Sequence, residues 1–285
     1  MWNLLYYFSY HIFILFSIYQ WFKILLVWYL ENSYPIPINT QYYGKIYIGH
    51  NLTKNDKLKL KLEIDKIAIE SVSCIPKYSI MKGEEIEDKI FIIIYDYYHL
   101  PIAMNCMFSW NYKNRNIYHG GLFLVSNSYK NQGLQKYLNH FQKYVFLKNL
   151  PNLSLYVTDL GRSATGWKLL DTNSQYCYPS LLNKDKNQEF NKEAIKIAEV
   201  FYNTIAKKSC GVSTNSSYDK NTLCIKNSND KEGGGFEELT QFEENRLSKD
   251  NRYNDKILEL CPDVKDELII IAKVDLLYLF KKMLF

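Results

Sequence analysis

Residues 119–138 constrain the fold of this chain more than any other stretch of the sequence. Residues 122–125 are apolar, which is typical of a strand, and residues 126–132 are polar residues that favour a turn. From Gly133 onward, the apolar residues recur at helical spacing. The stretch therefore predicts a strand, a tight polar loop and the start of a helix. Free backbone N–H groups at such a start, added to the positive end of the helix dipole, favour binding of a phosphate group.

The segments on either side of this loop predict a sheet covered by helices. Upstream, three apolar runs separated by turn residues predict an antiparallel meander, and downstream an amphipathic helix precedes further strands. The expected strands cover residues 45–49, 89–95, 102–110, 117–125, 153–158 and 175–178, and the expected helices cover residues 53–71, 133–149 and 163–170. The expected fold class is therefore α+β, with a mixed, mainly antiparallel sheet flanked by helices.

The loop also carries a motif. Residues 130–135, Lys-Asn-Gln-Gly-Leu-Gln, resemble the Arg/Gln-x-x-Gly-x-Gly/Ala signature of the GNAT-type N-acetyltransferases, which follows a strand and opens a helix, as it does here. Lys130 stands for the usual Arg or Gln and keeps a positive charge without the fork geometry of arginine. Gln135 stands for the usual small residue. The order of the expected elements over residues 45–180 is similar to the GNAT acyl-CoA N-acyltransferase fold as well.

The resemblance implies a binding site for acetyl-CoA. In that family the loop holds the pyrophosphate, and the strands before and after the next helix splay apart so that the pantetheine arm fits between them. A backbone N–H near Val125 is the oxyanion donor that the resemblance implies. The residues expected to bind the cofactor are Leu124, Val125, Lys130, Asn131, Gln132, Gly133, Leu134 and Gln135.

The implied reaction is transfer of an acetyl group from acetyl-CoA to an unidentified amine by direct attack. It needs a base for the amine proton and an acid for the departing thiolate. The candidate bases are His119 and Asp159, for which the alternative is a structural polar residue at a strand end. Family members often carry an Asn and a Tyr at the positions of Gly161 and Lys168. The candidate acids that could substitute are Tyr156, Tyr176 and Tyr178, with Tyr178 preferred.

Composition argues against several other classes of protein. The formal net charge of +5 suits an anionic ligand or a membrane surface but falls short of the clustered basic face of a nucleic-acid binder, so no nucleic-acid partner is expected. The six cysteines form no Cys-x-x-Cys pair, and the five histidines show no ligand spacing, so no metal site is expected. The sequence shows no Ser/His/Asp order and no nucleophilic Cys setting.

The two ends of the chain lie outside the GNAT-like region. Residues 4–30 are nearly all apolar and aromatic, and a helix of about 20 such residues can span a bilayer. The alternatives are a membrane anchor and a hydrophobic helix packed on the domain, so we expect the protein to be membrane-associated or cytoplasmic. The expected parts are a hydrophobic helix (1–32), a GNAT-like acyltransferase domain (40–182) and a C-terminal extension (183–285) with a helix, a polar loop, a strand and a final helix over residues 276–285.

Three functions are compatible with these features. The first is an acyl-CoA-dependent N-acyltransferase, and the second is a catalytically inactive GNAT-like module that binds CoA or serves as a scaffold, with or without a membrane tether. Gln135, Gly161 and Lys168 favour the second, because they depart from the family pattern. The third is a membrane-anchored interaction protein whose α+β domain binds no nucleotide.

Overall fold

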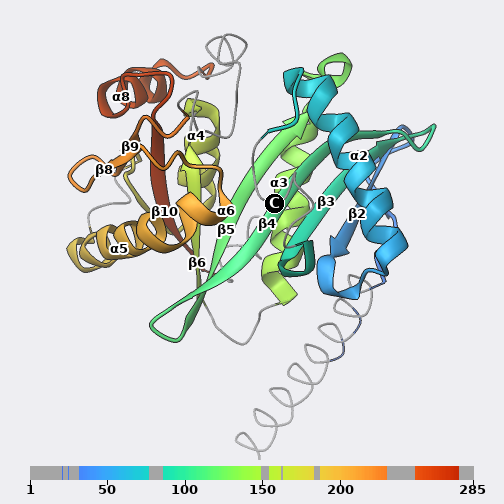
Figure 1. Ribbon diagram of the computed structural model, residues 1–285, viewed down its shortest axis with the longest axis horizontal. Coiled ribbons are helices and arrows are strands. Elements are labelled where there is room, and N and C mark those ends of the chain that lie inside the picture. Colours follow the sequence, from blue (N-terminus) through green and yellow to red (C-terminus); the bar gives the residue numbers. More distant parts are fainter. Residues whose placement is uncertain are drawn as a thin grey trace, which may run out of the picture.

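The structure is a computed structural model that describes Trp21, Leu25 and residues 32–76, 86–148, 154–161, 163–182, 187–229 and 248–275. These residues form one mixed sheet with helices on both faces (Figure 1). Along the sheet the strand order is β1-β2-β3-β4-β5-β6-β10-β9-β8, and β7 pairs with β10. The expected α+β class and mainly antiparallel sheet are confirmed.

The described elements have the following bounds. The strands are β1 (Ile36–Pro37), β2 (Tyr42–Ile48), β3 (Lys89–Asp96), β4 (Pro101–Tyr112), β5 (Arg115–Val125), β6 (Ser154–Gly161), β7 (Tyr176–Tyr178), β8 (Ser217–Asp219), β9 (Cys224–Lys226) and β10 (Glu267–Asp275). The longer helices are α2 (Lys54–Val72), α3 (Leu134–Lys148), α4 (Ala164–Asn173), α5 (Gln188–Phe201) and α8 (Asn251–Leu260). The short helical segments are η1 (Gly49–Asn51), η3 (Ile86–Asp88), η4 (Asn127–Tyr129), η5 (Tyr202–Ala206) and α6 (Lys207–Ser209).

The helices expected at the two ends of the chain fall almost entirely outside the described residues. Of residues 4–30, only Trp21 and Leu25 are described, and both are helical and exposed. Residues 276–285 are not among the described residues. Within the part that is described, no helix is both long enough and apolar enough to cross a membrane. The membrane anchor and the terminal helix therefore stay predictions.

The meander expected upstream of the loop is present as β3, β4 and β5. These strands pair antiparallel in sequence order, and β2 pairs with the free side of β3. β3 is buried on both faces because alternate residues pack against different helices. Ile92 and Ile94 belong to the apolar cluster that contains α3, and Phe91 and Ile93 belong to the cluster that contains α2. This burial explains why β3 reads as an uninterrupted apolar run.

Two helical segments share one face of the sheet. Met104 and Cys106 of β4 belong to the cluster around α2, and Phe108 and Trp110 of the same strand belong to the cluster around α5. Because alternate residues of a strand point to one face, α2 and α5 cover the same face, over different ends of β4. α3 packs on the opposite face (Figure 1).

The strand β10 comes from the far end of the chain but lies inside the sheet. It pairs antiparallel with β6 along its whole length and with β7 on its other side. Residues 187–229 and 248–260, which the sequence assigns to an extension, therefore form an insertion between β7 and β10. This insertion packs against the sheet through α5 and against α4 through α8.

A β-bulge interrupts the pairing of β4 with β5. Asn105 pairs with Phe123 and Met107 pairs with Gly120, so Cys106 alone lies opposite two residues, Gly121 and Leu122. Because β5 carries one extra residue at the bulge, an odd-numbered side chain before it and an even-numbered side chain after it point to the same face of the sheet. On that face, His119 stacks on Phe201 of α5 and Leu124 packs in the cluster of α2. Only glycine fits at position 121, because a Cβ there would lie 2.4 Å from the carbonyl oxygen of Cys106.

Replacing Gly121 by alanine should therefore lower the free energy of unfolding by about 1–3 kcal/mol, the usual cost of overpacking a dense site. Gly120→Ala is the matched control, because its new methyl group would meet nothing closer than the Gln142 side-chain nitrogen at 3.4 Å. Urea unfolding of both variants gives the comparison. An equal loss of stability in the two variants would show that the bulge does not require glycine at position 121.

Candidate functional site

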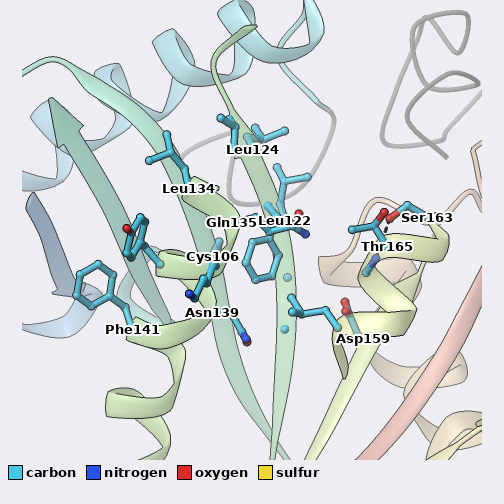
Figure 2. A pocket seen from close by; sticks show the side chains of 18 of the residues that line it. Cys106, Leu122, Leu124, Leu134, Gln135, Asn139, Phe141, Asp159, Ser163 and Thr165 are labelled. Atoms are coloured by element: carbon cyan, nitrogen blue, oxygen red, sulfur yellow. Dashed lines mark hydrogen bonds between the residues drawn. The ribbon is translucent and has the colours of Figure 1, made fainter. Parts of the chain in front are cut away.

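The strands β5 and β6 pair over only part of their length. The parallel pairing joins Ile117–Gly120 to Tyr156–Asp159 and ends there, although β5 continues to Val125 and β6 to Gly161. The strands diverge beyond this point, as the sequence resemblance implies. A cleft of about 1510 Å³ opens at the divergence and is lined from both faces of the sheet. Figure 2 shows it between β5 and α4, with the side chain of Asp159 pointing into it.

The edge of β5 that faces the cleft has no strand partner among the described residues. Residues 123–125 pair with β4 on one side, but the pairing with β6 on the other side ends at Gly120. Leu122, Phe123, Leu124 and Val125 all line the cleft. The backbone of these residues can therefore pair with an extended ligand in the way that a further strand would.

The loop after β5 forms one end of the cleft. Asn131 and Gly133 adopt positive φ angles, 65° and 76°, which end the loop tightly before α3 begins at Leu134. The space around a Cβ at Gly133 is open, with no atom within 4 Å. A large group such as a phosphate can therefore approach the first turn of α3, where backbone N–H groups and the helix dipole favour an anion.

The structure brings together all but one of the predicted cofactor residues. Leu124, Val125, Lys130, Asn131, Gly133, Leu134 and Gln135 line the cleft. Gln132 does not line it. Its side chain accepts a hydrogen bond from the hydroxyl of Tyr42 and donates one to the carbonyl oxygen of Ser128 at 3.3 Å, so it holds the loop against β2.

Lysine side chains line the cleft from several segments of the chain. Lys130, Lys136 and Lys143 line it from the loop and α3, and Lys168 and Lys249 line it from α4 and the insertion. Lys168 also pairs with Asp250, at 3.2 Å between Nζ and Oδ2. Among the described residues that line the cleft, the only carboxylates are those of Asp159 and Glu267. This distribution suits a ligand that is anionic at the loop end.

Asp159 lies where β5 and β6 separate. The carboxyl carbon of Asp159 would lie 3.9 Å from a Cβ placed at Gly120. Oδ1 of Asp159 accepts a hydrogen bond from the backbone N–H of Leu160 at 2.9 Å. Loss of solvation raises the pKa of Asp159 to about 7, with a further increase from the charge of Glu267 and a decrease from the hydrogen bond of Leu160. Near neutral pH, this carboxyl group can both accept and release a proton.

His119 lies on the other side of the sheet and is buried. Its ring packs between Phe108 and Phe201, with both ring centroids 4.9 Å away. Burial and the charge of Lys89 lower the pKa of His119 to about 3, against a smaller opposing effect of Thr158. The imidazole is therefore neutral at physiological pH and a weaker base than Asp159. Its Nε2 lies 3.6 Å from the sulfur of Cys210.

The candidate acid Tyr178 does not reach the cleft. It pairs with Ile271 in the sheet and is not among the described residues that line the cleft; nor are Tyr156 and Tyr176. Gly161 and Lys168 line it, at the positions where the family often has Asn and Tyr. A Cβ at Gly161 would lie 2.6 Å from Ile270 Cδ1, so packing against β10 explains the glycine.

Several cleft residues were not predicted from the sequence. Ser163 and Thr165 line the cleft at the start of α4, where the hydroxyl of Ser163 accepts a hydrogen bond from the N–H of Gly166 at 3.1 Å (Figure 2). The others come from distant segments and have no local signal that marks them as site residues: Lys89, Cys106, Ser209, Cys210, Ser248, Lys249 and Glu267.

The chain therefore has an α+β fold with a cleft between two diverging strands. No protein-family model matches the sequence, and no curated protein matches it. Two similar solved structures are N-acetyltransferases of the family that the sequence resembles. YhbS of Escherichia coli, a GNAT family N-acetyltransferase in complex with CoA, is 13% identical with a TM-score of 0.36, over 47% of this chain and 69% of that chain.

The second solved structure is a GCN5-related glucosamine N-acetyltransferase region of a fungal multi-domain GH3 β-N-acetylglucosaminidase. It is 14% identical with a TM-score of 0.32, over 42% of this chain and 14% of that chain. The present chain thus spans only a small part of that protein's length. Because both TM-scores are low, the functional proposal below depends on the cleft of this chain itself.

The raised pKa of Asp159 makes a testable prediction about stability. The folded protein holds the Asp159 proton up to about pH 7, whereas the unfolded chain releases it near pH 4, so stability is lost between these values as pH rises. Asp159→Asn should remove this loss and gain on the order of 2 kcal/mol relative to wild type above pH 7, after allowance for partial exposure, and little at pH 4.

Urea unfolding of wild type and variant across this pH range measures the difference, and Asp255→Asn at an exposed position of α8 is the matched control. A difference between wild type and Asp159→Asn that does not change from pH 4 to pH 8 would contradict the assignment.

Proposed function

We propose that this protein is an acyl-CoA-dependent N-acyltransferase that transfers an acetyl group from acetyl-CoA to an amine. The observation that carries the proposal is the divergence of β5 and β6 around a cleft that ends at the first turn of α3. A long ligand with an anionic end and an extended amide-containing arm fits this arrangement. Coenzyme A has both features.

The position of the cofactor follows from the two ends of the cleft. Its pyrophosphate binds at residues 130–135, where the open space at Gly133, the start of α3 and the nearby lysines all favour an anion. Its pantetheine arm lies along Leu124 and Val125 and hydrogen-bonds the free edge of β5. The thioester then lies near Gly120 and Asp159.

The chemistry assigned to the protein is modest, because a thioester is already activated. Holding the amine and the thioester together supplies much of the rate. Asp159 accepts the proton of the attacking amine, which its pKa of about 7 allows at neutral pH. A backbone N–H on the free edge of β5 stabilises the oxyanion; Val125, the expected donor, is five residues along β5 from Gly120 and therefore too far from this thioester. His119, whose lowered pKa makes it a weak base, is not needed for this step.

A second candidate is a module that binds CoA without catalysis, as a scaffold or with a membrane tether. It is favoured by one observation: none of the three candidate acids, Tyr156, Tyr176 and Tyr178, lines the cleft. Attachment to a membrane through residues 4–30 belongs to either candidate and stays a prediction. Turnover with an amine separates the two candidates.

CoA binding has a direct test. Free acetyl-CoA at about 100 times its dissociation constant should raise the free energy of unfolding by about 2.7 kcal/mol, measured as a shift in melting temperature. Gly133→Glu should abolish the shift, because its carboxylate would occupy the phosphate site. Gly133→Ala is the matched control: it carries the same backbone strain at φ 76° but no charge, so it should keep most of the shift. An equal shift in wild type and Gly133→Glu would refute the site.

The role of Asp159 is tested by kinetics. Once an amine substrate is found by screening, Asp159→Asn should lower kcat about 10²- to 10⁴-fold and leave acetyl-CoA binding intact, because the side chain acts on the amine proton only. For the wild type, kcat/KM should rise with pH through an apparent pKa near 7. Unchanged kcat in the variant would remove Asp159 from the mechanism and leave the cleft assignment standing.

A further inference from the structure

A cysteine, a histidine and a threonine form a hydrogen-bonded chain at the wall of the cleft. Cys210 Sγ lies 3.6 Å from Nε2 of His119, and Nδ1 of the same ring lies 3.2 Å from Oγ1 of Thr158. All three side chains are buried, and Cys210 and His119 line the cleft. This is the arrangement of a nucleophile, a base and a group that orients the base.

The surroundings of Thr158 fix the tautomer of His119. The Thr158 hydroxyl donates to the carbonyl oxygen of Tyr118 at 3.4 Å, and its oxygen accepts from Trp110 Nε1 at 3.4 Å. With the hydroxyl proton directed to Tyr118, this oxygen accepts from His119, and this arrangement puts the ring proton on Nδ1. Nε2 then has a free lone pair that faces the thiol of Cys210.

The insertion between β7 and β10 places Cys210 at this position. The helix α5 widens into the π-helical segment η5, continues as α6 and ends at Cys210, whose N–H bonds the carbonyl oxygen of Ala206 at 3.0 Å. Gly211, at φ 67°, then turns the chain away. π-Helical turns are rare and frequently occur at functional sites. Here the turn brings one end of a long helix against β5.

A second thiol in the cleft, that of Cys106, has a different setting. Cys106 also lines the cleft and is buried, but among the described residues its sulfur makes only a weak hydrogen bond, at 3.9 Å, to the carbonyl oxygen of its neighbour Met107. Burial raises the pKa of both thiols, so neither is a thiolate at rest. The difference between them is the imidazole beside Cys210. Cys106 is therefore a natural control.

We propose that Cys210 is an acyl-accepting nucleophile, with His119 as its base and Thr158 orienting the ring. The ligand class is an acyl thioester or another activated acyl ester held in the cleft. This inference rests on the proposed function only for the identity of the thioester. Cys210 is then a second acceptor of the acyl group besides the amine. When no amine is bound, the acyl group passes from the thioester to Cys210.

The exchange balances without any further reactant. The lowered pKa of His119 and the raised pKa of Cys210 disfavour a resting ion pair, so the thiol proton moves to Nε2 of His119 only as Cys210 Sγ attacks the acyl carbonyl carbon. The tetrahedral intermediate collapses, the bond from the carbonyl carbon to the coenzyme A sulfur breaks, and the proton on Nε2 passes to the departing thiolate. One thioester replaces another. An amine or water that attacks the Cys210 thioester then releases the acyl group.

The test uses the full chain and p-nitrophenyl acetate, an activated ester that needs no coenzyme A site. Wild type and Cys106→Ser should release a burst of one nitrophenolate per protein molecule, with the acetyl group on Cys210 in peptide mass spectra. Cys210→Ser should show no burst. His119→Gln should slow the burst about 10²- to 10⁴-fold. Circular dichroism of each variant confirms that it is folded.

A thermal shift with CoA in the same preparations separates this inference from the proposed function. A burst that depends on Cys210 supports the inference whether or not CoA shifts the melting temperature. A CoA shift without a burst in folded wild type, or an equal burst in Cys210→Ser, overturns it and leaves the proposed function in place. Acetylation of Cys106 in place of Cys210 overturns it as well.

Discussion

The close approach of β4 and β5 at Gly121 is the constraint on which the site depends. Cys106 lies opposite both Gly121 and Leu122, so β5 has one extra residue here, and such a bulge increases the local twist of a strand. The extra residue also shifts the alternation of β5, so that odd-numbered side chains before it and even-numbered side chains after it point to the same face of the sheet. The pairing of β5 with β6 ends at the adjacent residue, Gly120. The cleft therefore opens where the bulge alters the strand, and residues 121–125 are left with one free edge.

The two sides of the cleft differ in chemistry. The end next to the loop and α3 carries lysines and the open start of a helix, which suits the anionic part of a cofactor. The interior holds a carboxyl group with a raised pKa, Asp159, and the neutral pair of His119 and Cys210. Under the proposed function, anion binding and proton transfer therefore belong to different parts of one cleft. The insertion contributes to both parts, through Lys249 and through Cys210.

The sequence predicts the central elements well because their signals are local. Alternation, turn residues and helical spacing are enough to place β3, β4, β5 and α3, and the loop motif contains five residues that line the cleft. The position of Asp159 on the strand beside β5 follows from the order of the elements. Its raised pKa does not, because desolvation depends on the walls of the folded cleft.

The residues that the sequence misses are those brought in by distant pairing. β10 enters the sheet between β6 and β7, and nothing in its apolar run says which strands it joins. Cys210 meets His119 across 91 residues, so no spacing rule detects the pair. Tyr178 shows the opposite problem. It is a candidate substitute for the expected tyrosine at position 168, but β10 pairs with its strand and Tyr178 does not line the cleft.

The central claim is that coenzyme A lies between β5 and β6 with its phosphates at the start of α3. Hydrogen exchange of the backbone amides, measured by mass spectrometry with and without saturating CoA, tests it directly. The account predicts slower exchange in residues 121–125 and 133–136, with little change in α2 and β2. Slower exchange confined to other segments, or no change at residues 121–125 when CoA is bound, would contradict it.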